Sequence, residues 1–207
     1  GRMPSFAARL AGKRAVMEIL GETVPWQNIA IEQRGSERPQ IQLGGQAQSL
    51  AKKRGISSFP LSLAHDEDEN LAVAFVLGVY DSPSQLQLGT DIASVEHFKR
   101  IQLRKHGDRF LQRVYSEEEL YEAGGDAALL AEKWAGKEAV AKALGTGVRV
   151  EGVALQDIRI LTGDDGLPYV QLKGAALEQA GKIGLQTWMI RIIKHLQTPL
   201  AFVIGTS

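Results

Sequence analysis

Apolar residues recur at helical spacing over residues 6–20, and this pattern predicts a long helix near the start of the chain. Beyond it, short alternating runs bounded by Gly and Pro predict strands, with one further short helix among them. Strands are expected at residues 29–32 and 39–43, the short helix at residues 47–54, and two more strands at residues 60–65 and 71–77. The first part of the chain thus combines helices with antiparallel hairpins.

The same order of elements returns later in the chain. Residues 11–21 read AGKRAVMEILG and residues 135–145 read AGKEAVAKALG. Downstream of the second copy, strands, a helix and further strands are expected at residues 157–161, 168–172, 175–181, 188–195 and 200–204. His65 and His195 occupy equivalent places. Helix–hairpin combinations are common in α+β proteins, but several features recurring in one order indicate an internal repeat.

We therefore predict an α+β fold made of two tandem similar halves, residues 1–82 and 83–207, that form an intramolecular pseudodimer. A site at the interface of two such halves takes residues from both. Because both halves lie in one chain, a functional monomer is expected.

A segment without a counterpart near the N-terminus lies between the copies. Residues 88–98 predict a short strand that ends near Asp91 and passes into a helix. That helix, extended to residue 113, is strongly basic, with Asp108 as its acidic residue; its cations are Lys99, Arg100, Arg104, Lys105, Arg109 and Arg113. Residues 116–119 read SEEE, a capping box that starts the next helix at about Glu117.

The amino-acid composition excludes several classes of function and site. The 207 residues include 24 Lys and Arg and 24 Asp and Glu, so no global charge marks a generic nucleic-acid or membrane binder. The absence of cysteine excludes disulfides, thiol nucleophiles, zinc fingers and iron–sulfur sites. The apolar stretch at residues 71–80 is too short to span a membrane, and residues 1–20 lack a signal peptide. A cytoplasmic protein is expected.

Candidate chemistry concentrates on the second copy of the repeated helix, at Lys137, Glu138 and Lys142. Glu138 and Lys142 share one helix face, where an exposed ion pair is the simple alternative to a catalytic role. The first copy carries Arg14 in place of Glu138, so we expect one working site. Asp91 follows Gly-Thr and is either a helix-capping residue or, if the fold brings it to Glu138, half of a carboxylate pair suited to Mg²⁺.

Two further features are ambiguous on their own. His65 ends an apolar strand, where a hydrogen-bonded structural histidine is the common case. Gly145 and Gly147 follow the helix that carries Lys142, so they read as a C-cap and turn, and they also allow the backbone to approach a ligand closely. The sequence contains no P-loop, no Gly-x-Ser-x-Gly elbow and no His-Glu-x-x-His motif.

Taken together, GTDI at 89–92, WAGKEAVAKALGTG at 134–147 and LSLAH at 61–65 resemble the 4′-phosphopantetheinyl transferase superfamily. The two copies, with the His segment ahead of Gly-x-Asp, resemble its pseudodimeric, surfactin-synthetase-activating class. The run from Lys-Glu-Ala to Gly-Thr-Gly and the basic helix resemble the small holo-acyl-carrier-protein synthases.

The resemblance implies Mg²⁺-dependent transfer of 4′-phosphopantetheine from coenzyme A to a serine of an apo acyl or peptidyl carrier protein, releasing adenosine 3′,5′-bisphosphate. Asp91 and Glu138 would hold Mg²⁺, Lys142 would contact phosphate near the reacting centre, and His65 would bind coenzyme A phosphates, with Gly145 and Gly147 beside it. Glu138, directly or through a metal-bound water, would accept the serine proton.

The basic helix fits a docking surface for the carrier, since carrier proteins present an acidic helix beside the modified serine. On this interpretation Arg100, Arg104 and Arg109 contact the carrier, with a solvated helix face as the alternative.

Three departures accompany the resemblance. Ala93 stands where the pseudodimeric class has a second acid, Ala64 replaces the Ser that precedes the family His, and the N-terminal arm of the longer class is missing. With Ala93 in place of the second acid, we expect Mg²⁺ to bind still, with one more water molecule as a ligand. The alternative function is a non-catalytic carrier-binding or scaffolding domain of a larger synthase.

Overall fold

The fold was analysed in a computed structural model that describes the chain except for residues 1–2, 34, 36–37, 81–84 and 147–152. Helices and strands are mixed along the chain, which confirms the α+β prediction. The first stretch combines two helices, a 3₁₀ turn and two hairpins: α1 (Met3–Leu20), η1 (Trp26–Asn28), β1 (Ile29–Glu32), β2 (Gln40–Leu43), α2 (Gly45–Lys53), β3 (Leu61–Asp66) and β4 (Leu71–Val76).

A connecting strand and three helices follow: β5 (Leu86–Ile92), α3 (Val95–Gln102), α4 (Gly107–Val114) and α5 (Glu117–Ala123). The prediction of one continuous basic helix is therefore wrong, because the chain turns between α3 and α4. Gly107 permits this turn, since a methyl group there would lie 2.2 Å from the carbonyl oxygen of Ile101. The predicted capping box is confirmed by reciprocal hydrogen bonds between Ser116 and Glu119.

The last stretch repeats the order of the first: α6 (Ala127–Leu144), η2 (Leu155–Asp157), β6 (Ile158–Thr162), β7 (Pro168–Leu172), α7 (Gly174–Lys182), β8 (Thr187–His195) and β9 (Thr198–Thr206). Helices α1 and α6 both have 18 residues, and α2 and α7 both have 9. The α6 helix begins earlier than the sequence motif indicated, after Asp126, whose side chain accepts from the amide of Ala128.

Close packing recurs at equivalent glycines. A methyl group at Gly12 of α1 would lie 2.7 Å from Ile31, and one at Gly136 of α6 would lie 2.9 Å from Ile160. Each helix therefore rests directly on the equivalent strand of its own hairpin. Both arrangements need a residue without a side chain at the crossing point.

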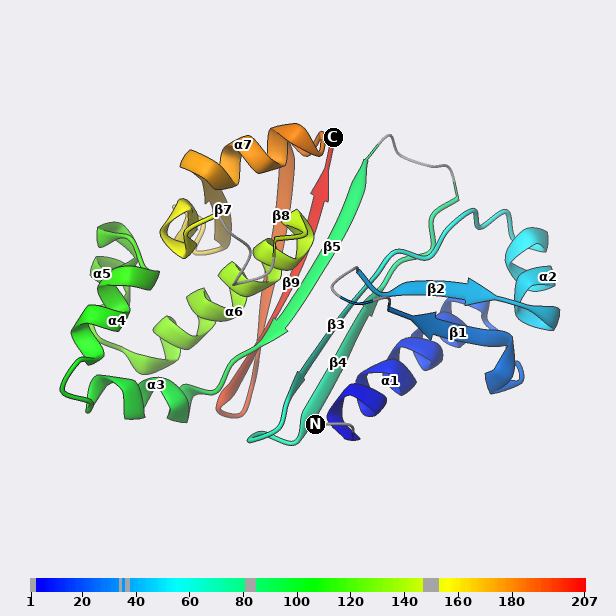
Figure 1. The fold of residues 1–207 in the computed structure, drawn as a ribbon, viewed down its shortest axis with the longest axis horizontal. Helices are drawn as coiled ribbons and strands as arrows, with labels where there is room; N and C mark the ends of the chain where they lie inside the picture. Colours follow the sequence, from blue (N-terminus) through cyan, green and yellow to red (C-terminus); the bar gives the residue numbers. More distant parts are fainter. Residues whose placement is uncertain (1–2, 34, 36–37, 81–84, 147–152) are drawn as a thin grey trace.

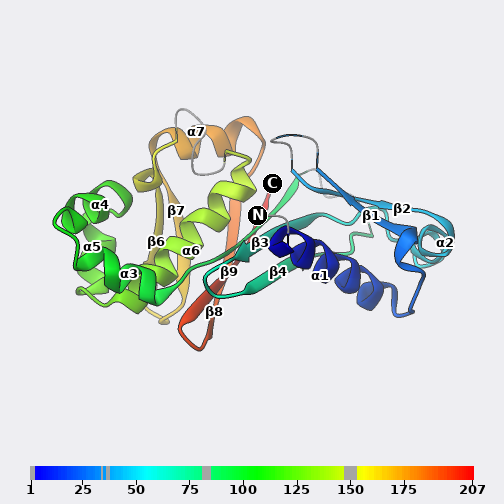
Figure 2. The ribbon, with the colours of Figure 1, turned by 60° about the horizontal axis from the view of Figure 1, so that its bottom comes forward.

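Each repeated helix covers its own strands (Figure 1). Helix α6 packs on β5 and β9 of the antiparallel sheet β5–β9–β8, and α1 packs on the β3–β4 hairpin. The buried apolar residues form separate clusters around α6 and around α1. In both views α3, α4 and α5 gather at one end of the molecule and α2 lies at the other (Figure 2).

The two parts meet along β3, β4, β5 and β9. Strand β3 lies beside β5, where the amide of Thr90 donates to Ser62 Oγ at 2.9 Å. The ring of Phe75 on β4 packs edge-on against Phe202 on β9, with 5.4 Å between the centroids. Within the described part of the chain, no helix is both long enough and apolar enough to cross a bilayer.

Candidate functional site

Strand β5 reaches the backbone of α6 at Gly89. A methyl group at this position would lie 1.8 Å from the carbonyl oxygen of Ala139, so no other residue fits without moving the helix. Asp91, two residues along the same strand, is thereby brought to α6. Packing therefore explains the Gly-x-Asp motif. The glycine lets β5 approach the backbone of α6, and the aspartate then reaches Lys142 on that helix.

Lys142 of α6 connects β5 with β3. Its ammonium group donates to Asp91 Oδ1 at 2.8 Å, to the carbonyl of Thr90 at 2.9 Å and to the carbonyl of Leu63 at 3.3 Å. Its ion-pair partner is Asp91, and Glu138 is 6% exposed, so the alternative of an exposed Glu138–Lys142 pair does not describe this helix face. A single cation thus ties together residues from both copies of the repeat.

The charge of Asp91 acts on the carboxyl group of Glu138. Burial and the charge of Asp91 raise the pKa of Glu138 to about 7, while Lys142 acts in the opposite direction. Burial also raises the pKa of Asp91, against the lowering effect of Lys142, and Asp66 adds a smaller repulsion. Bringing both acids to one place therefore has an electrostatic cost that a nearby cation reduces.

The donor set fits a hard divalent ion that keeps much of its water. Carboxylate oxygens are the ligands that Mg²⁺ prefers, and Mg²⁺ is commonly held by one or two carboxylates with waters and substrate phosphates. Among the residues that the structure describes, no cluster of three or more His, Cys, Asp or Glu side chains forms a metal site. Asp91 and Glu138 would thus be the protein's ligands, and waters and phosphate oxygens would supply the rest.

A cavity of about 370 Å³ opens beside Lys142. His65 at the end of β3, Lys142 and Gly145 all line it, so three of the predicted coenzyme A contacts share one cavity. The fourth, Gly147, lies outside the described residues. Arg9 and Arg38, which the sequence analysis missed, line the same cavity.

Arg38 fixes the end of α6. Its Nη2 donates to the carbonyl of Ala143 at 2.6 Å, and burial lowers the pKa of the guanidinium. Gly145 caps the helix with φ +77°, and a methyl group there would lie 2.6 Å from Arg38. Alignment of the two copies could have pointed to Arg38. The first copy has an arginine before the proline that starts its second strand, at Arg38-Pro39, where the second copy has an apolar residue, at Leu167-Pro168.

Lys137, also a sequence candidate, lies apart from this cavity. Its side chain is fully buried and bonds to Glu119 at 2.7 Å and to the carbonyl of Leu155 at 3.0 Å. Desolvation lowers its pKa to about 8, although Glu119 opposes this. Lys137 therefore joins α6 to α5 and to the turn before β6.

The basic residues of the connecting helices are exposed. Arg100 lies on α3, Arg104 lies in the turn after it, and Arg109 lies on α4. Helix α3 begins three residues after β5 ends, so this surface follows Asp91 closely along the chain (Figure 1).

Comparisons with known proteins point to one family. A family model described as the 4′-phosphopantetheinyl transferase superfamily matches residues 87–194. A holo-[acyl-carrier-protein] synthase of Halorhodospira halophila is 39% identical over 120 residues, which are 56% of this chain and 94% of that protein. One from Roseiflexus sp. is 48% identical over 93 residues, or 42% of this chain and 67% of that protein.

Solved structures agree with this assignment. The crystal structure of holo-[acyl-carrier-protein] synthase from Neisseria meningitidis matches with a TM-score of 0.53 and 33% identity over 58% of this chain and 98% of that chain. The Helicobacter pylori synthase in complex with coenzyme A, at 24% identity, shares the fold with a TM-score of 0.52 over 57% of this chain and 99% of that chain.

Proposed function

Because the chain belongs to the 4′-phosphopantetheinyl transferase superfamily and is a transferase, we propose that it moves the 4′-phosphopantetheine group of coenzyme A to a serine of an apo acyl carrier protein. The observation that carries the proposal is the position of Asp91, Glu138 and Lys142 beside a cavity with basic residues from both copies of the repeat. Adenosine 3′,5′-bisphosphate is the product released.

Basic side chains would hold the donor. Arg9, Arg38, His65 and Lys142 line the cavity beside the carboxylates, and none of the described lining residues is acidic. Phosphate groups are bound well by such a set, since hydrogen bonds between charged partners are stronger than neutral ones. Lys142 would orient the phosphate next to Asp91, its present partner.

Asp91 and Glu138 would hold Mg²⁺. When bound, the ion would neutralise charge on the pyrophosphate of coenzyme A, and phosphoryl transfer depends on such neutralisation and on positioning. Ala93 leaves the protein without the further acid that the pseudodimeric class has at this point.

Glu138 is suited to accept the serine proton. Burial and Asp91 raise the pKa of Glu138 to about 7 in the metal-free protein, and a bound cation would lower that pKa, so the carboxylate would be ionised at neutral pH and able to take a proton. The proton passes to the carboxylate directly or by way of a water molecule.

The two copies would divide the work. In the proposed arrangement residues 1–82 supply donor contacts such as Arg9, Arg38 and His65, and residues 83–207 supply the carboxylates and Lys142. Both halves lie in one chain, so a pseudodimeric monomer would contain the whole site. The exposed Arg100, Arg104 and Arg109 would dock the acidic face of the carrier.

Intact-mass spectrometry of apo carrier proteins tests the proposal. After incubation with the protein, coenzyme A and Mg²⁺, a carrier should gain the mass of one phosphopantetheine arm, and a chelator should prevent the gain. Glu138→Gln should lose the activity, whereas the matched change at the exposed Glu178 of α7 should keep it. Binding of carrier and coenzyme A without any transfer would instead favour the scaffolding function.

A further inference from the structure

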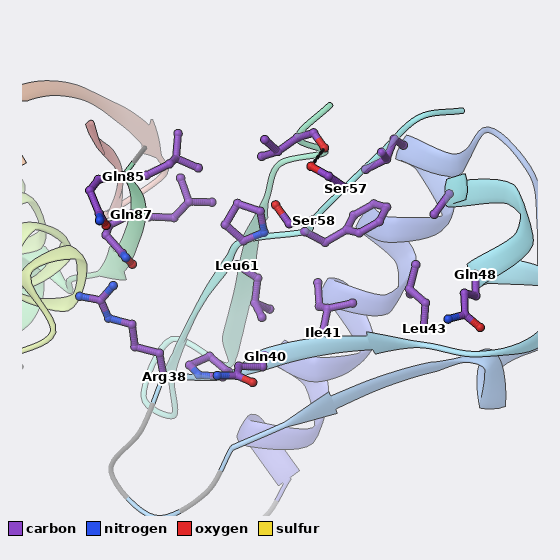
Figure 3. A pocket seen from close by; sticks show the side chains of 18 of the residues that line it. Arg38, Gln40, Ile41, Leu43, Gln48, Ser57, Ser58, Leu61, Gln85 and Gln87 are labelled. Atoms are coloured by element: carbon purple, nitrogen blue, oxygen red, sulfur yellow. Dashed lines mark hydrogen bonds between the residues drawn. The ribbon is translucent and has the colours of Figure 1, made fainter. Parts of the chain in front are cut away.

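One face of helix α1 takes no part in the function proposed above. A cavity of about 880 Å³ between β2 and the segment of Leu61 borders the donor site, because Arg38 and Leu61 line both (Figure 3). A separate cavity of about 810 Å³ lies along α1 and shares no described lining residue with either of them. Its lining includes Ala7, Leu10, Arg14, Glu18, Glu22 and Trp26. We call these six residues and Phe6 the α1 face.

The large apolar side chains of the α1 face are exposed to solvent. Phe6 is 63% exposed, and Leu10 and Trp26 are exposed as well. Helix α1 lies on the outside of the molecule, over β3 and β4 (Figure 2). Exposed apolar side chains that gather in one place mark interaction surfaces.

The repeat shows that the equivalent surface of the second half is covered. In the alignment of the copies, Leu130 takes the place of Phe6 and is only 1% exposed. Trp134 takes the place of Leu10 and packs against Phe98 of α3, with 5.8 Å between the ring centroids. In the described part of the chain, no helices accompany α1 in the places of α3, α4 and α5. The α1 face is therefore a surface of the kind that packs against helices, without its cover.

Single hydrogen bonds support the equivalence of the two surfaces. Lys13 donates to the carbonyl of Trp26 at 3.0 Å, and Lys137 donates to the carbonyl of Leu155 at 3.0 Å. In the second half this lysine also pairs with Glu119 of α5 at 2.7 Å. The cover of α6 thus brings an acid as well as apolar side chains. A partner for the α1 face should therefore carry acids next to its apolar groups.

The charges of α1 are separated along the helix. The cations Arg9, Lys13 and Arg14 come first, and the acids Glu18 and Glu22 follow. This order is unfavourable for the helix dipole, which favours acids at the N-terminal end and cations at the C-terminal end. The first turn contains no acid and the last turn no cation. A second α1 running in the opposite direction would place acids opposite cations and supply apolar groups at the same time.

We propose that the α1 face binds the α1 face of a second copy of this chain, in a two-fold symmetric dimer with antiparallel α1 helices. Arg14 then lies opposite Glu18 of the partner subunit, and two-fold symmetry makes this contact twice. Phe6 and Leu10, near the start of α1, lie toward Trp26 of the partner subunit. The occupant is thus a second copy because its charges and its apolar groups both complement this surface.

The dimer leaves the proposed active site complete in each chain. None of the described residues that line the donor cavity belongs to the α1 face. The inference therefore goes beyond the proposed function and does not depend on it. A helix of 18 residues is about 27 Å long, so one helix from each copy forms a small interface. Weak association, with a dissociation constant in the micromolar range, is expected.

Sedimentation equilibrium of the full chain measures the association. The apparent mass should rise from that of one chain at low micromolar concentration to that of two chains as the concentration approaches the millimolar range. Added salt should weaken the association, because it screens the opposed charges. The mass of one chain at every concentration, or growth beyond two chains, would overturn the proposal.

Charge reversals test the antiparallel arrangement. The side chains of Arg14 and Glu18 are exposed, so reversing either charge should leave the fold intact. Arg14→Glu and Glu18→Arg should each weaken the association roughly tenfold or more, because like charges then meet across the two-fold axis. An equal mixture of these two variants should recover the association, and so should the double variant. Lys99→Glu, in an exposed ion pair of α3, is the control and should associate like the wild type.

Two exposed leucines test the apolar contact. Leu10 on the α1 face is 44% exposed, and Leu177 on α7 is 58% exposed. Leu10→Glu should weaken the association roughly tenfold or more, because it places a charge in the apolar part of the interface. Leu177→Glu adds the same charge elsewhere and should leave the association unchanged.

The outcomes keep this inference apart from the proposed function. Equal association of the wild type, Arg14→Glu and Leu10→Glu would overturn the α1 dimer. A mixture of the two charge variants that associates no better than either variant alone would refute the antiparallel arrangement and with it the proposal. If the wild type dimerises as described but no carrier gains the phosphopantetheine arm, the proposed function fails and the dimer stands.

Discussion

Replacing Glu138 by glutamine should change how the stability of the protein depends on pH. The pKa of Glu138 is about 7 in the folded chain, against an ordinary value of 4.5, because the carboxyl is buried and faces Asp91. Between these two values the folded state binds more protons than the unfolded state, so the free energy of unfolding falls as the pH rises. A rise of the pKa from 4.5 to about 7 corresponds to roughly 3 kcal/mol of the free energy of unfolding. This contribution is present below pH 4.5 and is lost progressively as the pH rises to about 7.

Urea unfolding at pH 5 and pH 8, with a chelator present, measures this effect. From pH 5 to pH 8 the wild type should lose about 2–3 kcal/mol more of its free energy of unfolding than Glu138→Gln does, because the neutral amide does not ionise. The contributions of distant titrating groups cancel in this difference. Glu178→Gln, on the exposed face of α7, is the control and should show no relative change. Parallel behaviour of Glu138→Gln and the wild type would show that the raised pKa is wrong.

Adding Mg²⁺ at pH 8 extends the same experiment. A cation at the two carboxylates favours their ionised forms and binds only the folded chain, so it stabilises the wild type. The stabilisation should be smaller in Glu138→Gln and in Asp91→Asn, each of which removes one proposed ligand. An equal rise in melting temperature for all three proteins would contradict the proposed metal site.

Three further perturbations test separate parts of the structure. Reversing Arg100 and Arg104 to Glu should raise the KM for the carrier roughly tenfold with little change for coenzyme A in steady-state assays, and equal changes would refute the docking surface. Arg38→Gln should weaken coenzyme A binding roughly tenfold, measured by calorimetry, since it removes a charged hydrogen-bond donor to a phosphate group. Unchanged affinity would exclude a contact between Arg38 and coenzyme A. Gly89→Ala should cost about 3 kcal/mol in urea unfolding because its methyl group meets the α6 backbone, whereas Gly181→Ala, in open space, should stabilise by about 0.5–1 kcal/mol. Similar stability of the two alanine variants would contradict the close packing of β5 on α6.

Local patterns predicted most of the secondary structure. The helix expected at residues 6–20 is α1, and the strands expected at 60–65 and 71–77 are β3 and β4 within a residue or two. These elements follow from periodicity and capping, which act over a few residues. The break between α3 and α4 was missed because basic residues continue through the turn, while the turn depends on how Gly107 packs against Ile101.

The site was only partly accessible from the sequence. Motif spacing selected Asp91 and Glu138, but 47 positions separate them, and their approach follows from the packing of Gly89 on α6. Arg9 and Arg38 were missed because their place at the cavity depends on how the two parts of the chain pack together. Such contacts come from tertiary structure, and local sequence patterns do not encode them directly.

The differences between the copies follow from what each part of the molecule must do. Packing restrains both copies, since each has its own core, and the equivalent glycines Gly12 and Gly136 meet equivalent isoleucines. Chemistry needs one site, so polar residues are free to differ: Arg14 stands in place of Glu138. Arg14 is exposed and forms an ion pair with Glu18, so this position lacks the burial that raises the pKa of Glu138. The second copy therefore carries the electrostatic cost of a buried carboxylate beside Asp91, and the first copy carries an exposed ion pair in its place.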